Sequence, residues 1–447
     1  MFNMRIPKTG NARDIKIYKN IAVSFLLKMI AAIISLVMVP LTLTCLGEYR
    51  NGVWLTISSM LLWIDQMDIG LGNGLRNKIA AYTAHGQTSE AKKAISSTLA
   101  MMICIIIPIA MILSFLIYHT DVFEFFNVEP STIPDFRSVL FASVILVCMT
   151  FVFKIVGNVY MGLQLPAVNN LIIVCGQAIA LVSTWLLLEN ECATFINIAV
   201  VNTFAPLLVF AFAYLITFYQ RYPKLRPSFT AVDLRIALSL GNLGVRFFWL
   251  QIAGVIQFMT ANILISKFFT PAMVTPYQVA YRYYSLVLVA FTVVCMPFWS
   301  ATTDAYEKGD KRWIRMANRR MNLLTALTAC AMILMTIVSP YVFQIWIGDK
   351  CHVPFSMTVL MAIYVFLLVM SIRYSYFLNG IGALRLQLYM TVMTIVFIPL
   401  AWFVSHTTHD ILYFMGVMCV CIAPSILVNK IQFSKILKGT AIGIWRI

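Results

Sequence analysis

Five basic side chains lie within long apolar stretches of the sequence, where charged residues are rare. They are Lys28, Lys154, Arg246, Arg282 and Arg373. A charge at the centre of a membrane-spanning helix costs about 2.5–3.5 kcal/mol on insertion scales, so such residues are expected to face a wet cavity or to bind an anion. The acidic residues in these stretches are too few to neutralise them. The pattern therefore predicts a cationic, anion-attracting site that binds substrate.

Four of these cations form two pairs at nearly the same separation along the chain. Lys28 and Arg246 are 218 residues apart, and Lys154 and Arg373 are 219 residues apart. This spacing predicts an internal duplication, with two lobes of six spans in the same orientation. In transporters built in this way the substrate lies between the lobes, near the middle of the membrane.

The composition of the chain predicts which kind of secondary structure carries these five residues. The chain has 447 residues, of which 61% are hydrophobic and 11% charged, and its mean hydropathy is +0.86. Because soluble domains carry about 25% charged residues, a soluble enzyme, a disordered chain and a disulfide scaffold are excluded. No nucleophile–base set, catalytic carboxylate pair, metal cluster or nucleotide-binding motif is recognisable. We therefore expect a polytopic all-α membrane protein that is not an enzyme and needs no cofactor.

Twelve apolar stretches are long enough to cross a bilayer, which needs about 20 residues. They lie near residues 20–45, 52–69, 95–118, 137–161, 166–188, 194–219, 244–268, 277–303, 317–343, 354–379, 386–404 and 411–429. Spans 1–6 form a predicted N-lobe, residues 1–222, and spans 7–12 a predicted C-lobe, residues 223–447. The two lobes are expected to surround a central cavity.

The basic residues outside the spans predict the topology. With the N-terminus in the cytoplasm, 24 of the 33 Lys and Arg residues fall on the inner side and four on the outer side. This bias places both termini in the cytoplasm. It also accounts for most of the net charge of +16, so nucleic acid is not an expected partner. The segment from Lys308 to Arg320 is expected to form an amphipathic helix on the inner leaflet.

Two interpretations remain open for several of the charged residues. Lys154 and Arg373 lie six to eight residues from the inner ends of their spans. Their long side chains could line the lumen or extend to the headgroups. Asp65, in span 2, could couple transport to a proton or a cation, or could be the charge partner of a nearby cation.

Five sequence segments carry a family resemblance. They are residues 47–54 (GEYRNGVW), 68–78 (DIGLGNGLRNK), 277–282 (YQVAYR), 297–301 (PFWSA) and 305–310 (AYEKGD). They resemble the Wzx-type O-antigen and polysaccharide flippases of the multidrug/oligosaccharidyl-lipid/polysaccharide (MOP) exporter superfamily. The resemblance spans most of the chain, and the second segment is the most specific.

The resemblance implies a protein of the bacterial cytoplasmic (inner) membrane that serves lipopolysaccharide or related polysaccharide biosynthesis. Its substrate would be an undecaprenyl-diphosphate-linked oligosaccharide, moved from the inner to the outer leaflet by alternating access. Further expected partners are a proton or sodium ion, membrane lipid, and a polysaccharide polymerase and ligase. The glycan stays undefined, and a teichoic or capsular precursor is an alternative cargo.

Two other functions compete with this interpretation. A cation-coupled multidrug exporter of the same superfamily would need lumen carboxylates and aromatic rings to pair with its cargo, and here the charge balance is reversed. A membrane scaffold without transport activity would have no use for five buried cations.

Overall fold

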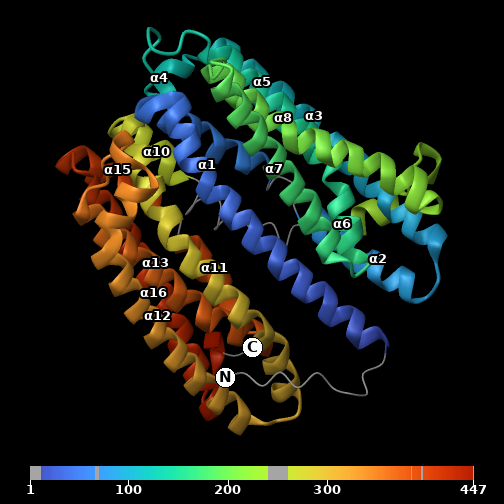
Figure 1. Ribbon diagram of the computed structural model, residues 1–447. Coiled ribbons are helices and arrows are strands. Elements are labelled where there is room, and N and C mark those ends of the chain that lie inside the picture. Colours follow the sequence, from blue (N-terminus) through green and yellow to red (C-terminus); the bar gives the residue numbers. More distant parts are fainter. Residues whose placement is uncertain (1–11, 66–69, 240–259, 384, 394–395, 446–447) are drawn as a thin grey trace. The chain divides into compact units, whose positions relative to one another are not determined.

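The computed structural model describes residues 12–65, 70–239, 260–383, 385–393 and 396–445. Within these ranges every regular element is a helix, and there is no strand (Figure 1). The predicted all-α class is thereby confirmed. Helices are the expected solution because a backbone in hydrocarbon must satisfy its hydrogen bonds within the segment.

The chain forms two compact units that do not coincide with a single cut in the sequence. Of the described residues, the first contains 12–41, 64–65, 70–121 and 134–239, and the second contains 42–63, 122–133, 260–383, 385–393 and 396–445. The long helix α1 (Ala12–Asp65) contributes to both units. It is broken at Gly47, whose φ of 68° and ψ of 175° are not helical. Glycine suits this position because it adopts positive φ without steric cost.

The first unit is a bundle in which α8 lies against α5 and α7, while α2 lies against α3 and α6. Its helices, besides the start of α1, are α2 (Leu71–Ala84), α3 (Thr88–His119), α5 (Phe136–Phe153), α6 (Ile155–Gly162), α7 (Pro166–Glu189) and α8 (Phe195–Leu215). The chain continues from α8 in a wider, π-helical segment, Ile216–Arg221. A hydrogen bond of 2.9 Å between the Tyr160 and Thr217 hydroxyls connects α6 to this segment.

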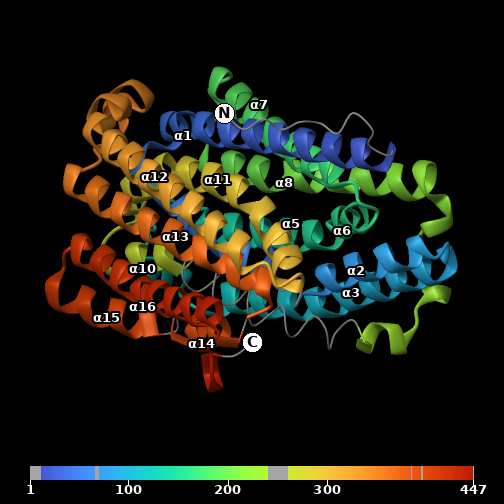
Figure 2. The same cartoon turned by 90° about the horizontal axis from the view of Figure 1, so that it is seen from below.

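The second unit is arranged around α13, which packs against α11, α12 and α16 (Figure 2). Its helices, besides the end of α1, are α4 (Val122–Phe126), α10 (Thr260–Phe268), α11 (Pro271–Glu307), α12 (Lys311–Trp346), α13 (Phe355–Ile381), α14 (Arg385–Met393), α15 (Phe397–Thr408) and α16 (Ile411–Lys438). The end of α1 is joined to α11 by a hydrogen bond of 2.8 Å from the Thr275 hydroxyl to the Glu48 carbonyl oxygen.

Nine helices in the described part of the chain are long and apolar enough to cross a membrane. The number of twelve stays a prediction, because four predicted spans take another form. Spans 1 and 2 are joined as α1, span 7 is described only from Thr260, and span 11 consists of α14 and α15. The expected amphipathic segment is also different, since Lys311–Arg320 forms the first turns of the long helix α12.

The helix bounds repeat along the chain. Together α5 and α6 cover residues 136–162, and α13 covers 355–381, a shift of 219 residues at both ends. A glycine near the end of each of these two segments makes a close contact with a neighbouring helix. A Cβ on Gly162 would lie 2.7 Å from Ile79 Cβ, and one on Gly380 would lie 2.8 Å from the Trp299 carbonyl oxygen. The predicted duplication therefore appears in both helix bounds and packing.

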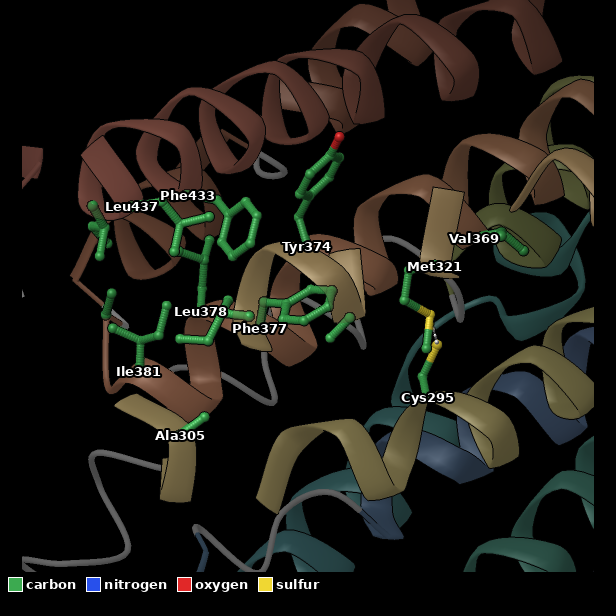
Figure 3. Packing of buried hydrophobic residues seen from close by; sticks show 14 of the residues in the cluster. Cys295, Ala305, Met321, Val369, Tyr374, Phe377, Leu378, Ile381, Phe433 and Leu437 are labelled. Atoms are coloured by element: carbon green, nitrogen blue, oxygen red, sulfur yellow. Dashed lines mark hydrogen bonds between the residues drawn. The ribbon is translucent and has the colours of Figure 1, made fainter. Parts of the chain in front are cut away.

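A hydrophobic cluster fills the space where α11, α12, α13 and α16 meet. Figure 3 shows Phe377 and Leu378 of α13 beside Phe433 of α16. The rings of Phe377 and Phe433 have centroids 5.1 Å apart. Tyr374, one turn before Leu378, is also buried, and its ring lies 6.1 Å from that of Phe433. Arg373, the only buried charged residue among the described residues, lies on α13 directly before Tyr374 of this cluster.

Candidate anion-binding site

Arg373, in the second half of α13, is 4% exposed and is the single charged side chain among the buried residues that the structure describes. Its Nη2 atom donates hydrogen bonds to the side-chain oxygens of Asn318, at 2.6 Å, and Asn322. The guanidinium carbon lies 4.7 Å from the centre of the Tyr374 ring. These contacts hold the side chain within the bundle at this site.

Both asparagines belong to α12 and lie four residues apart, so they are on one face of the helix. Their amide oxygens accept hydrogen bonds but carry no charge. Among the described residues, neither ion pair of the structure involves Arg373; the pairs are Lys93–Glu90 and Lys308–Asp304. The amides therefore orient the guanidinium without cancelling its positive charge.

A cavity of about 660 Å³ opens at Arg373, between α12, α13 and α16. Its described lining contains four basic residues and no acidic one. The lining residues are Arg315, Asn318, Asn322, Met370, Arg373, Tyr374, Lys430, Phe433, Ser434, Leu437 and Lys438. A volume of this size is typical of small-ligand pockets, which range from about 300 to 1,000 Å³. Its charge predicts an anionic occupant.

The cavity is graded from a charged entrance to a buried end. Arg315, Lys430 and Lys438 are exposed, whereas Arg373 is buried. The entrance residues come from the first turns of α12 and the last turns of α16. These are the ends that the predicted topology places on the cytoplasmic side. An anion can thus be attracted by exposed charges and then bound by a fixed guanidinium.

Lys154, the counterpart of Arg373 in the repeat, lies in the first unit at the junction of α5 and α6. It is half-buried, and its Nζ atom lies 6.0 Å from the centre of the Phe210 ring. The helix tightens here, because the Gly157 amide donates to the Lys154 carbonyl oxygen at 2.9 Å, a bond across three residues. The described lining of the Arg373 cavity does not include Lys154.

Arg282 is half-buried on α11, four residues after Gln278 and so on the same helix face. The Gln278 amide donates to the Asn262 side-chain oxygen at 2.7 Å, and the Asn262 amide donates to the Ser59 hydroxyl at 2.5 Å. These hydrogen bonds therefore connect α11 to α10 and to the end of α1.

The remaining predicted site residues belong to the first unit or lie outside the described residues. Lys28 is an exposed residue of α1. Asp65 ends this helix, and its side chain lies outside the described part of the structure, as does the whole of Arg246. Their roles stay predictions. None of these three residues belongs to the described lining of the Arg373 cavity.

Sequence reasoning assigned Arg315, Lys430 and Lys438 to the cytoplasmic ends and so missed their convergence on Arg373. The spacing of these residues nevertheless indicates a shared helix face. Arg315 lies three residues before Asn318 and seven before Asn322, so all three lie on one face of α12, which begins before the predicted span 317–343.

Two curated relatives, each named "Putative O-antigen transporter", match part of the chain. The protein from Salmonella typhi is 24% identical over 289 residues, which are 63% of this chain and 64% of that protein. The protein from Salmonella typhimurium (strain LT2) is 23% identical over 301 residues, or 66% of each chain. The matched part thus spans just under two thirds of either relative. The chain matches no known family model.

Solved structures of multidrug resistance MATE family transporters of the MOP superfamily match over nearly the whole chain. The inward-facing conformation of one has a TM-score of 0.75 at 15% identity, covering 92% of this chain and 96% of that chain. An outward-facing conformation has a TM-score of 0.59 at 14% identity, covering 95% and 99%. This chain has the same fold as these MATE transporters of the MOP superfamily. Together with the Salmonella relatives, the MOP fold confirms the resemblance to the Wzx-type group and a multi-pass membrane protein.

Proposed function

We propose that this protein is a flippase that moves an undecaprenyl-diphosphate-linked oligosaccharide, an O-antigen or related polysaccharide unit, from the inner to the outer leaflet of the bacterial cytoplasmic membrane. The names of the two Salmonella relatives support the cargo class, and the MOP fold supports transport by alternating access. Coupling to a proton or sodium gradient, with Asp65 as coupling residue or charge partner, belongs to the same proposal.

The observation that carries this proposal is the sign of the buried charge. Arg373 is held by neutral amides at the end of a cavity whose described lining contains four basic residues and no acidic one. Diphosphate is a strong acceptor of charge-assisted hydrogen bonds, and guanidinium groups bind it through several donors at once. The anionic headgroup could thus be stabilised while the polar glycan avoids hydrocarbon.

A cation-coupled multidrug exporter is the second candidate function. It is favoured by the MATE transporters that share the fold, since their titles describe multidrug resistance. Exporters of organic cations need buried carboxylates, which attract the cargo. Among the described residues the only buried charged side chain is a cation, so we favour the anionic cargo.

Transport in the host strain tests the proposal. Deletion of the gene should remove surface polysaccharide and leave lipid-linked oligosaccharide in the inner leaflet. Lys28→Ala, Arg246→Ala and Arg282→Ala should each restore less surface polysaccharide than the unaltered protein, at equal membrane content. Lys224→Ala, an exposed residue of a short connecting segment, is the matched control. Normal export by all three variants would refute the role of the cations, and export of organic cations instead of glycan would favour the second candidate.

A further inference from the structure

The cavity around Arg373 lies entirely within the second unit, where all its described lining residues belong to α12, α13 and α16. We propose that this cavity is an anion-binding site within a single helix bundle and that its ligand is a phosphate group carried by a lipid or free in the cytoplasm. The inference deepens the proposed function and rests on it in one respect, since both take the Arg373 cavity as a place where a phosphate group binds.

The first argument is an unused donor. Arginine has five N–H donors. Both hydrogen bonds that the structure shows to the asparagines start from Nη2. The Nε atom is buried, and within the described part of the chain it has no hydrogen-bond partner. Because a buried donor without an acceptor is unfavourable, a ligand oxygen at this position would stabilise the site.

The second argument is the choice of partners. A structural arginine in an apolar bundle is usually paired with a carboxylate, because removing the charge from water is expensive. Here Asn318 and Asn322 occupy the place of such a partner. Their oxygens fix the orientation of the guanidinium while its charge remains available. This arrangement suits an anion that arrives from outside the protein.

The third argument is the position and shape of the cavity. Lys430 and Lys438 could reach lipid headgroups from the end of α16 without any special site. Arg373 differs, because it lies eight residues before Ile381, the end of α13, or roughly 12 Å along the helix axis. The apolar side chains of Met370 and Leu437 form part of the wall. A headgroup phosphate could therefore enter past the lysines while its apolar part lies along this wall.

The decisive experiment measures ligand binding to the purified full-length protein. Three probes distinguish the sources of phosphate: inorganic pyrophosphate, phosphatidylglycerol in nanodiscs of phosphatidylcholine, and undecaprenyl phosphate. Bound molecules are counted by native mass spectrometry, and affinities are measured by titration with a thermal-shift readout. We expect at least one probe to bind in a manner that depends on Arg373. The probe that binds identifies the source: a soluble anion, a bulk lipid or the isoprenoid carrier.

The key variant is Asn318→Asp, which keeps an oxygen acceptor for Arg373 but adds a negative charge. It should fold, since the hydrogen bond at 2.6 Å is preserved. Phosphate affinity should fall by roughly tenfold to a hundredfold, because the added carboxylate neutralises the guanidinium and repels the anion. Arg373→Gln should weaken binding similarly, and Lys438→Gln by roughly threefold, as typical of an exposed charge.

Arg319→Gln is the matched control, because Arg319 follows Asn318 on α12, is exposed and does not line the cavity. It removes one positive charge from the same helix and should leave binding unchanged. The proposal is overturned if none of the probes binds, or if Asn318→Asp and Arg319→Gln bind phosphate equally well. The transport assay uses Lys28→Ala, Arg246→Ala and Arg282→Ala, none of which belongs to the described lining of this cavity, so failure of this inference and failure of the proposed function remain distinguishable.

Discussion

Lys154 and Arg373 occupy equivalent places in the two repeats, yet their surroundings differ. Lys154 is half-buried at a break between two helices, beside the Phe210 ring. Arg373 is buried within one continuous helix and is bound by two asparagine side chains. The duplication has thus kept a basic residue and the helix bounds around it, while the partners of that residue have diverged.

The difference has a physical consequence. A lysine over an aromatic ring is a point charge that can move, and the interaction is worth about 0.5–1 kcal/mol at an exposed site. An arginine fixed by two acceptors presents its remaining donors in one direction. We therefore expect the second unit to make the more specific contact with an anion and the first unit to contribute mainly electrostatic attraction.

The largest predicted effect comes from removing each cation in turn. Arg373→Ala should lower export of surface polysaccharide by roughly tenfold to a hundredfold, because charge-assisted hydrogen bonds are lost. Lys154→Ala should lower it by roughly twofold to fivefold, the effect of a weak cation–π contact and a long-range charge. Export is measured in the deletion strain at matched protein content. Equal losses in the two variants would show that the repeats contribute alike.

Exchanging arginine and lysine at these two positions separates the effect of side-chain geometry on export from the effect of charge. Arg373→Lys keeps the charge but loses the planar group that can bind both asparagines, so we expect a loss of export of about tenfold. Lys154→Arg should be close to neutral, since a guanidinium also interacts with the Phe210 ring. The same export assay applies. Full activity of Arg373→Lys would mean that only the positive potential matters in the second unit.

The close-contact glycines extend the comparison from charge to packing. Gly380→Ala would place a methyl group 2.8 Å from a backbone oxygen, that of Trp299, and should cost about 2–3 kcal/mol. Gly162→Ala would meet the Ile79 Cβ at 2.7 Å and the Arg76 carbonyl oxygen at 3.0 Å, and should cost a similar amount, since both atoms are fixed by the backbone. Both should lower the melting temperature in detergent.

Gly416→Ala is the control for these variants, because a Cβ added at this position on α16 would meet nothing within 4 Å. It should leave the melting temperature unchanged or raise it slightly, as alanine is favoured over glycine in helices. A fall as large as that of Gly380→Ala would show that the loss does not arise from the close contact.

Much of the fold could be predicted from the sequence because bilayer thickness and hydropathy dictate it. The apolar runs gave the helices, and the spacing of Lys154 and Arg373 gave the duplication, which the bounds of α5, α6 and α13 reproduce. Less could be predicted where one helix carries two roles. The sequence predicts two separate spans where the structure has the single long element α1. The backbone is non-helical only at Gly47, so the second span follows the first without a loop.

The site could be predicted only in part, because side-chain partners depend on how helices pack. Sequence spacing identified Arg373 as an unusual charge but left its direction open. The sequence does not mark Asn318 and Asn322 as site residues, because a neutral amide within a span is not unusual in the way that a charge is. Lys430 and Lys438 were counted with the cytoplasmic charges, as the rule for topology sorts basic residues by side alone. Their convergence needs the contacts between α12, α13 and α16.

The smallest predicted effect compares one cysteine from each unit. Cys192, which follows α7 in the first unit, is exposed, whereas Cys351, which precedes α13 in the second, is buried. Burial raises the pKa of the Cys351 thiol, and the nearby Glu48 carboxylate raises it further. The Cys351 sulfur donates to a carboxylate oxygen of Glu48 at 3.5 Å. At pH 8 the thiolate fraction of Cys351 is therefore low.

In two single-cysteine variants, which retain either Cys192 or Cys351 and none of the other cysteines, maleimide should label Cys192 quickly and Cys351 slowly at pH 8. Since the pKa of Cys351 is raised, its rate should keep increasing as the pH rises above 8. Glu48→Gln removes the negative charge, lowers the pKa and should speed labelling of Cys351 by roughly twofold to threefold. Thr44→Val, which removes the acceptor of a 2.7 Å hydrogen bond from Lys350 and leaves the Glu48 charge in place, is the control and should not do so. If both variants speed labelling equally, exposure of the segment rather than the Glu48 charge governs the reactivity of this thiol.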